Sequence, residues 1–250
     1  MAGSMGREKL PSSLFDLISS SLDFIFPPVC LGCEGIGAHW CEKCEAELQV
    51  LTQPYCQICC KVIEVESEVI CEECQTENPA FYSARALARY TSSFARAIVH
   101  LKYQPNKVFA ASFVPRLAAI VNKEAWDIDV IVPIPLSHER FIERGYNQVE
   151  MFSKPLARML GLPHGGKFLS RAKNTRPQVG LSHTERKKNV KDAFLGEKHL
   201  VSGKKLLLVD DVMTTGSSFH SAALALKAVG ALEVRGLSLA RADQHVLEDI

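Results

Sequence analysis

The chain of 250 residues has little that would place it in a membrane. Its apolar stretch near the N-terminus, LFDLISSSLDFIF, covers 13 residues and carries Asp16 and Asp23, whereas a membrane helix needs about 20 consecutive apolar residues. No small-residue cleavage site follows, because Pro27 and Pro28 lead directly into the first cysteine. We therefore expect a cytoplasmic protein without a membrane span, whose residues 1–29 contain a helix packed on its own core.

The sequence also lacks two common phosphate-binding fingerprints. Neither G-x-x-x-x-G-K-[ST] nor G-x-G-x-x-G occurs in it. The first absence argues against a P-loop NTPase and the second against a Rossmann dinucleotide site.

A net excess of charge is missing too, since the formal charge is only +1. That sum hides two opposite segments. Residues 30–79 hold ten Glu, no Asp and two Lys, whereas residues 167–205 hold eleven Lys or Arg against three acids. Nucleic-acid backbones are bound by clustered cations that neutralise their phosphates, so we do not expect the acidic segment to bind a nucleic acid by itself.

Cysteine, by contrast, is abundant in one region. Four C-x-x-C pairs fall within 45 residues, and each pair places two sulfurs on one side of a tight turn. Without a secretory signal the thiols stay reduced, so we favour two structural zinc ions over a disulfide framework. The pairs can combine consecutively or crosswise, and Cys60 is left as an extra thiol. The predicted ligands are Cys30, Cys33, Cys41, Cys44, Cys56, Cys59, Cys71 and Cys74.

Beyond residue 79 the pattern alternates between strands and helices. Strands are predicted at 83–90, 128–135, 205–209 and 234–240, and helices from residue 93, at 107–122, at 146–160 and at 217–229. This order predicts an α/β fold, a mostly parallel sheet with helices on both faces. We expect three parts: residues 1–29, a zinc-ribbon module at 30–79, and the α/β domain at 80–250.

The run VDDVMTTGSS, residues 209–218, carries the clearest chemistry. Asp210 and Asp211 follow a buried strand, where parallel sheets bind ligands. The next turn enters a helix, so its N–H groups, its hydroxyls and Gly216 suit a phosphate monoester. Adjacent acids suit vicinal hydroxyls and Mg²⁺. An ordinary capped helix would not need both acids.

These residues resemble the ribose-phosphate motif of type I phosphoribosyltransferases. Together with the cysteine pairs, HLKY, VPIPLSHERFIERGYNQ and RPQVGLSHTERKKNV occur in the order typical of the ComF family, the competence-protein and GntX-like phosphoribosyltransferases. The resemblance spans roughly residues 14–242 and implies 5-phosphoribosyl 1-pyrophosphate with Mg²⁺ as ligand. It assigns the ribose to Asp210 and Asp211, and the 5′-phosphate to Thr214, Thr215, Gly216, Ser217 and Ser218.

Pyrophosphate needs a second site, which the loop after residue 135 is expected to supply. Arg144 would neutralise the pyrophosphate charge, Gly145 would let the ligand approach, and Asn147 and Gln148 would orient neighbouring side chains. In the alternative interpretation, Arg140 and Arg144 form a solvated helix face. Lys102 is a further candidate. Residues 172–190, with Arg176 and Arg186, would form a cationic lid over the leaving group or a plain surface loop. No role is assigned to His100, His138 or His183.

Three functions stay open at this stage. The first is an enzyme of nucleoside metabolism that transfers a phosphoribosyl group to an acceptor. The second is a competence factor in DNA uptake that handles single-stranded DNA with a phosphate pocket that need not turn over. The third uses the acidic zinc ribbon, including Glu64, Glu66 and Glu68, to dock a protein of the competence machinery.

Overall fold

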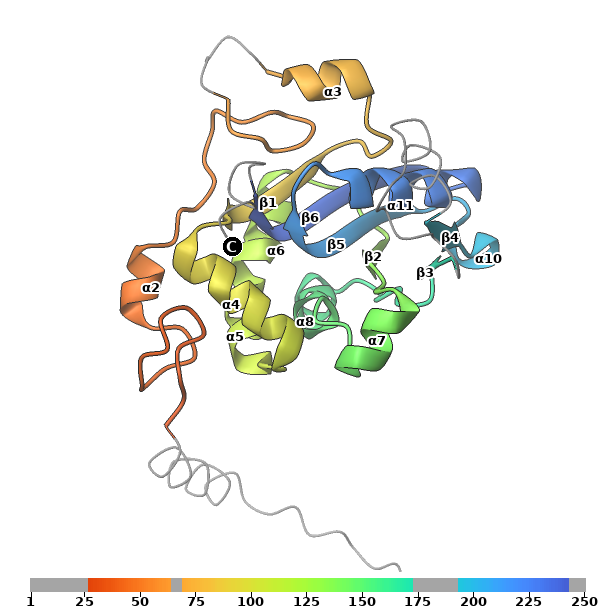
Figure 1. Cartoon of the computed structure of the whole chain (residues 1–250). Coiled ribbons are helices and arrows are strands. Elements are labelled where there is room, and N and C mark those ends of the chain that lie inside the picture. The colour runs from red at the N-terminus through yellow and green to blue at the C-terminus, as the bar shows by residue number, and fades with distance from the viewer. Residues whose placement is uncertain (1–26, 64–68, 173–192, 243–250) are drawn as a thin grey trace, which may run out of the picture.

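The computed structural model describes residues 27–63, 69–172 and 193–242. Their centre is a four-stranded sheet in the order β1-β6-β5-β2, and every neighbouring pair runs parallel (Figure 1). Its strands are β1 Ala84–Arg89, β2 Val130–Pro133, β5 Lys205–Met213 and β6 Glu233–Arg241. All four carboxyl ends therefore meet at one edge.

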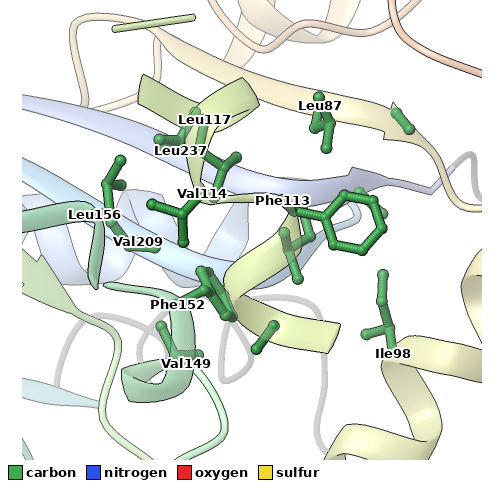
Figure 2. Close-up of a cluster of buried hydrophobic side chains, with 14 of the residues drawn as sticks. Leu87, Ile98, Phe113, Val114, Leu117, Val149, Phe152, Leu156, Val209 and Leu237 are labelled. Atoms are coloured by element: carbon green, nitrogen blue, oxygen red, sulfur yellow. The ribbon is translucent and has the colours of Figure 1, made fainter. Parts of the chain in front are cut away.

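Helices cover both faces of this sheet, which confirms the predicted fold class. Alternate β5 residues enter different cores: Leu207 and Val209 join one, and Leu206 and Leu208 join the other. Figure 2 shows the first core, where Val209 and Leu237 meet Val114, Leu117, Phe152 and Leu156 from helices. That face carries α4 Ser92–Tyr103, α5 Lys107–Ser112, α6 Val114–Lys123 and α8 Glu150–Leu160, and the other carries α11 Ser217–Ala228.

Shorter elements lie around this frame. The cysteine-rich segment contains α2 Glu42–Ala46 and α3 Glu72–Glu77. α7 His138–Arg144 follows β2, and α10 Lys198–Val201 precedes β5. β3 Leu169–Arg171 pairs antiparallel with β4 Phe194–Gly196.

The predicted helices at 107–122 and 146–160 differ from the observed ones. The first is broken at Phe113 into α5 and α6, because Pro115 lacks the N–H that a continuous helix would donate to residue 111. The second begins at Glu150 instead of residue 146. Asn147 accepts a hydrogen bond from Val149 N (3.1 Å) in a local turn that precedes the helix.

The strand predicted at 205–209 runs on to Met213, so the two acids lie within β5. On one side its pairing with β6 continues through Asp210 and Met213. On the other side the pairing with β2 stops where Pro133 faces Val209. Beyond that point Asp210 and Asp211 have no β2 neighbour, and space opens beside them.

The cysteine-rich segment packs against the sheet and its helices. Trp40 makes edge contacts with the rings of Phe94, Phe109 and Phe113, at centroid distances of 5.6 to 5.8 Å. Val50 forms a bridge with Ala88 in β1. The helix expected within residues 1–29 lies outside the described residues, except for residues 27–29. In the described ranges, every helix is too short or too polar to traverse a lipid bilayer.

Candidate functional site

A pocket of about 240 Å³ opens at the edge where the parallel strands end. Tyr90 follows β1, residues 134–137 follow β2, and Asp210 and Asp211 lie near the end of β5. Because β2 stops at Pro133, the acids face this space with no β2 residue beside them. The pocket lining also includes Lys102, Arg140, Arg144, Gln148, Arg171, Val212, Thr214 and Ser218.

The acidic pair is held by its own backbone. Asp211 N donates to Asp210 Oδ1 (2.9 Å), and Val212 N donates to Asp211 Oδ1 (2.7 Å). Desolvation first, and then the negative charge of Asp211, raise the pKa of Asp210 well above its usual range. Two acids that repel each other in this way form a site that suits a cation or a pair of hydroxyl donors.

A hydrogen-bonded relay connects Asp211 to Arg144, which also lines the pocket. Arg144 Nη1 donates to Gln148 Oε1 (3.0 Å), and Gln148 Nε2 donates to Asp211 Oδ2 (2.9 Å). Lys102 Nζ lies 3.9 Å from the same Asp211 oxygen. Gln148 is buried, so this relay fixes where Arg144 enters the pocket.

The TTGSS loop, residues 214–218, leads from β5 into α11. Gly216 is the N-cap residue, with φ +79, a left-handed conformation that favours glycine. Ser217 N donates to Thr215 Oγ1 (3.3 Å), which tightens the turn. Thr214 and Ser218 line the pocket, whereas Thr215, Gly216 and Ser217 shape the loop between them. The positive end of the α11 dipole points toward this position.

The segment between β2 and α8 is helical where a pyrophosphate loop was expected. Ser137 caps α7 by accepting from Arg140 N (3.3 Å), and Gly145 ends it with φ +73. Arg140 and Arg144 thus lie on one helix, as the alternative expected, but Arg144 is partly buried and both side chains line the pocket, so they do not form a solvated face. Asn147 donates to Ile134 O (2.9 Å), so it fixes the loop and does not line the pocket.

Sequence reasoning missed Tyr90 and Arg171 as lining residues, and it did not predict Arg140 as a cation of the pocket. Arg171 lies on β3 and stacks over Phe194 at 5.1 Å. Burial, and then the charge of Arg140, lower its pKa. Its position at the edge of the basic stretch was visible in the sequence, but only the β3–β4 pairing brings it to the acids. Arg176 and Arg186 lie outside the described residues.

The eight predicted cysteine ligands form two clusters, and the pairs combine consecutively. In each cluster the sulfur atoms all lie within 4.8 Å of one another. Measured separations are 3.6 Å for Cys30–Cys44, 3.5 Å for Cys33–Cys41 and 3.6 Å for Cys59–Cys71. Four sulfurs at about 2.3 Å from a tetrahedral zinc ion would be about 3.8 Å apart. We name the clusters by their members: the first is Cys30, Cys33, Cys41 and Cys44, and the second is Cys56, Cys59, Cys71 and Cys74.

Main-chain donors also favour thiolates at both clusters. Cys41 N points at Cys30 Sγ (3.4 Å), and Cys71 N points at Cys56 Sγ (3.3 Å). Cys60 belongs to neither cluster, and burial raises the pKa of its thiol to about 11. Four thiolates leave no open position for substrate, so the clusters fit structural zinc.

Two protein-family models match the chain. Residues 21–75 match a double zinc ribbon domain, and residues 110–249, more than half of the chain, match a phosphoribosyl transferase domain. The two matches correspond to the cysteine clusters and to most of the α/β sheet.

Several curated proteins are similar to this chain over most of their length. Competence protein F of Haemophilus influenzae is 30% identical over 81% of this chain and 90% of its own. DNA utilization protein YhgH of Salmonella typhimurium is 27% identical over 80% of this chain and 96% of its own length. Competence protein ComFC of Bacillus subtilis is 27% identical over 80% of this chain and 83% of its own length.

Solved structures align more weakly. The adenine phosphoribosyltransferase of Thermoanaerobacter pseudethanolicus is 16% identical, with a TM-score of 0.34 over 54% of this chain and 84% of that chain. The assignment therefore rests on the family models and the sequence relatives: the chain belongs to the ComF family, in which a double zinc ribbon precedes a phosphoribosyltransferase domain.

Proposed function

We propose that this protein binds 5-phosphoribosyl 1-pyrophosphate together with Mg²⁺ and transfers the phosphoribosyl group to an acceptor. The observation that carries the proposal is that groups of both charges line one pocket. Two acids, Thr214 and Ser218 of the TTGSS loop, and four cations line it, and the cations are Lys102, Arg140, Arg144 and Arg171. A sugar that carries hydroxyls, a phosphate and a pyrophosphate matches this combination.

The ribose and its 5′-phosphate belong on the β5 side. The carboxylates of Asp210 and Asp211 would accept hydrogen bonds from the ribose 2- and 3-hydroxyls. They also offer the oxygen ligands that Mg²⁺ prefers, and the bound ion would neutralise pyrophosphate charge. The N–H groups of the TTGSS loop and the α11 N-terminus would hold the 5′-phosphate, with hydroxyls from Thr214 and Ser218.

The pyrophosphate belongs near the guanidinium groups. Arg144 Nε and Arg171 Nε are both buried and have no hydrogen-bond partner among the described residues. Unpaired buried donors cost folding free energy, so both side chains are held here at the expense of stability. Both line the pocket, where their guanidinium groups would donate to pyrophosphate oxygens, and the fork geometry of arginine suits phosphate better than an ammonium group does.

Transfer needs no protein nucleophile in this arrangement. The bond between the anomeric carbon and the pyrophosphate oxygen breaks, and its electron pair leaves with pyrophosphate. A lone pair of the acceptor forms the new bond to the anomeric carbon, and the proton that the acceptor loses passes to pyrophosphate or to water. Lys102, Arg144 and Arg171 stabilise the charge that grows on the leaving oxygen. Gln148 keeps Arg144 aligned through the relay to Asp211.

The names of the relatives support a biological setting. Proteins called competence protein F and DNA utilization protein cover most of this chain. We place the phosphoribosyl chemistry accordingly in the uptake or use of external DNA, where nucleotide breakdown yields nucleobases as candidate acceptors.

Calorimetric titration of the zinc-loaded chain with 5-phosphoribosyl 1-pyrophosphate and Mg²⁺ tests the proposal. The double variant Asp210→Asn, Asp211→Asn should abolish binding. Asp127→Asn, Asp129→Asn is the matched control, since these acids contact Lys205 at the opposite end of β5 and should leave binding unchanged.

Two results would contradict the proposal. One is a folded wild-type chain that shows no binding, and the other is equal affinity in the two double variants. Titration with a labelled single-stranded oligonucleotide would then test the alternative of a DNA-handling pocket without turnover.

A further inference from the structure

Arg241 joins the second cysteine cluster to the TTGSS loop. It ends β6, is 7% exposed, and donates to main-chain oxygens on three different segments. Nε donates to Cys59 O (3.2 Å), and Nη1 donates to Met213 O (3.3 Å), to Thr214 O and to Ala242 O (2.6 Å). Cys59 is a ligand of the second cluster, and Thr214 opens the loop. One planar guanidinium therefore fixes both backbones.

The turn around Cys59 is itself anchored to the sheet. Three successive carbonyls of this turn accept hydrogen bonds from β1 or β6. Arg85 Nη1 donates to Gln57 O (2.8 Å), Ala84 N donates to Ile58 O (2.6 Å), and Arg241 Nε donates to Cys59 O. Because the ligands hold the turn and the sheet holds its carbonyls, the second cluster forms a firm support for Arg241.

An apolar contact parallels the polar one. Phe81 belongs to the same buried core as the four cysteines of the second cluster, and its ring lies 6.2 Å from that of Phe219 on α11. A Cβ added to Gly216 would lie 3.5 Å from Phe81 Cζ and 3.1 Å from Met213 Cε. Gly216 of the TTGSS loop thus packs on side chains that belong to the same buried core as the second cluster.

The first cluster supports a different region. Arg96 Nε donates to Gly32 O (2.7 Å) between two of its ligands, and Trp40 packs on Phe94 and Phe113. These contacts fix the N-terminal part of α4 and the adjoining core. Arg96 provides a natural comparison, because it also joins a cysteine turn to the α/β domain but does not contact the loop.

We propose that Arg241 is a positioning residue through which the second zinc cluster sets the conformation of the TTGSS loop and its affinity for phosphate. The inference rests on the proposed function in one respect, the binding of a phosphate group by this loop. The loop would be well ordered only while the second cluster is intact, whereas the first cluster would affect the stability of the chain and not the loop.

Amide hydrogen exchange on peptides covering residues 213–219 tests the link without any ligand. Arg241→Lys keeps a cation but loses the fork, and Arg96→Lys is its matched control. Cys74→Ser disrupts the second cluster, and Cys33→Ser disrupts the first. We expect exchange of the loop to become about tenfold faster in Arg241→Lys and Cys74→Ser, and to stay within about twofold of wild type in the two controls.

A second measurement uses ribose 5-phosphate as the probe on the same zinc-loaded proteins. Its Kd should rise about tenfold in Arg241→Lys and remain unchanged in Arg96→Lys. By reciprocity, saturating ribose 5-phosphate should raise the affinity of the wild-type second cluster for zinc in an equilibrium competition with a chelator, and this gain should be lost in Arg241→Lys.

The outcomes separate this inference from the proposed function. Equal loop exchange in Arg241→Lys and Arg96→Lys overturns the role of Arg241, even if wild type binds the probe. Faster loop exchange in Arg241→Lys with no binding of the probe to wild type upholds the link between cluster and loop, and refutes phosphate binding. Circular dichroism confirms that each variant compared is folded.

Discussion

Replacing Arg171 with methionine should make the free protein more stable while it weakens substrate binding. The folded state disfavours the charged guanidinium, since burial and the nearby Arg140 lower its pKa. Its Nε is buried without a partner among the described residues. The charge of Arg171 therefore lowers the stability of the free protein, and an anion in the pocket would offset this cost.

The magnitude follows from two opposing effects. A buried unpaired donor costs about 1–3 kcal/mol, and the contact over Phe194 at 5.1 Å contributes about 0.5–1 kcal/mol in the other direction. Methionine keeps the length of the aliphatic stem. We therefore expect Arg171→Met to raise the free energy of unfolding by about 1 kcal/mol, and to raise the Kd for 5-phosphoribosyl 1-pyrophosphate by about 10- to 100-fold.

Urea unfolding with and without 5-phosphoribosyl 1-pyrophosphate and Mg²⁺ measures both effects in one experiment. A ligand that binds only the folded state adds stability that increases with the logarithm of its affinity, so the gain should be smaller in the variant. Arg158→Met, an exposed substitution on α8, is the control and should change neither value. A variant less stable than wild type, with an unchanged gain from ligand, would refute the reasoning.

Three further predictions follow from the structure. Cys60→Ala should retain two zinc ions per chain by elemental analysis, whereas Cys59→Ala should lose one, because only Cys59 belongs to a cluster; loss of zinc in both would contradict the assignment. Glu124→Gln should lower the free energy of unfolding by about 2–3 kcal/mol in urea, since it breaks a two-point contact with Arg85, whose side chain is 10% exposed; an unchanged midpoint would show that the pair adds nothing. Burial lowers the pKa of His164, so the unfolded chain binds a proton at higher pH than the folded chain does, and stability should fall as the pH drops below about 6.5. His164→Asn should flatten this part of the plot of unfolding free energy against pH. A variant whose plot runs parallel to that of wild type would refute the role of His164.

The sequence predicted those features that depend on local pattern. The spacing of the C-x-x-C pairs identified eight cysteines that lie in two clusters, and it left Cys60 aside. Alternating strands and helices predicted the parallel sheet and its covered faces. Where the predicted bounds of helices were wrong, a single side chain decided the outcome: Pro115 divides one helix, and the turn at Asn147 delays another.

Other features required the tertiary structure, because they depend on where distant segments meet. Consecutive pairing of the cysteines could not be chosen from spacing alone, since crossed pairing has the same local turns. The end of β2 at Pro133 determines where β5 loses its neighbour, which opens the pocket beside Asp210. Arg140 and Arg171 come from different elements and meet only in that pocket.

The amino-acid sequence by itself thus determined the class of fold, the cysteine ligands and the acidic pair, because each of these follows from residue type and short-range spacing. Only the tertiary structure decided which cations face the acids and how the second cluster reaches the TTGSS loop. The contacts of Arg241 illustrate the reason: they join residues that are 182 and 28 positions apart, and no local pattern encodes such distances.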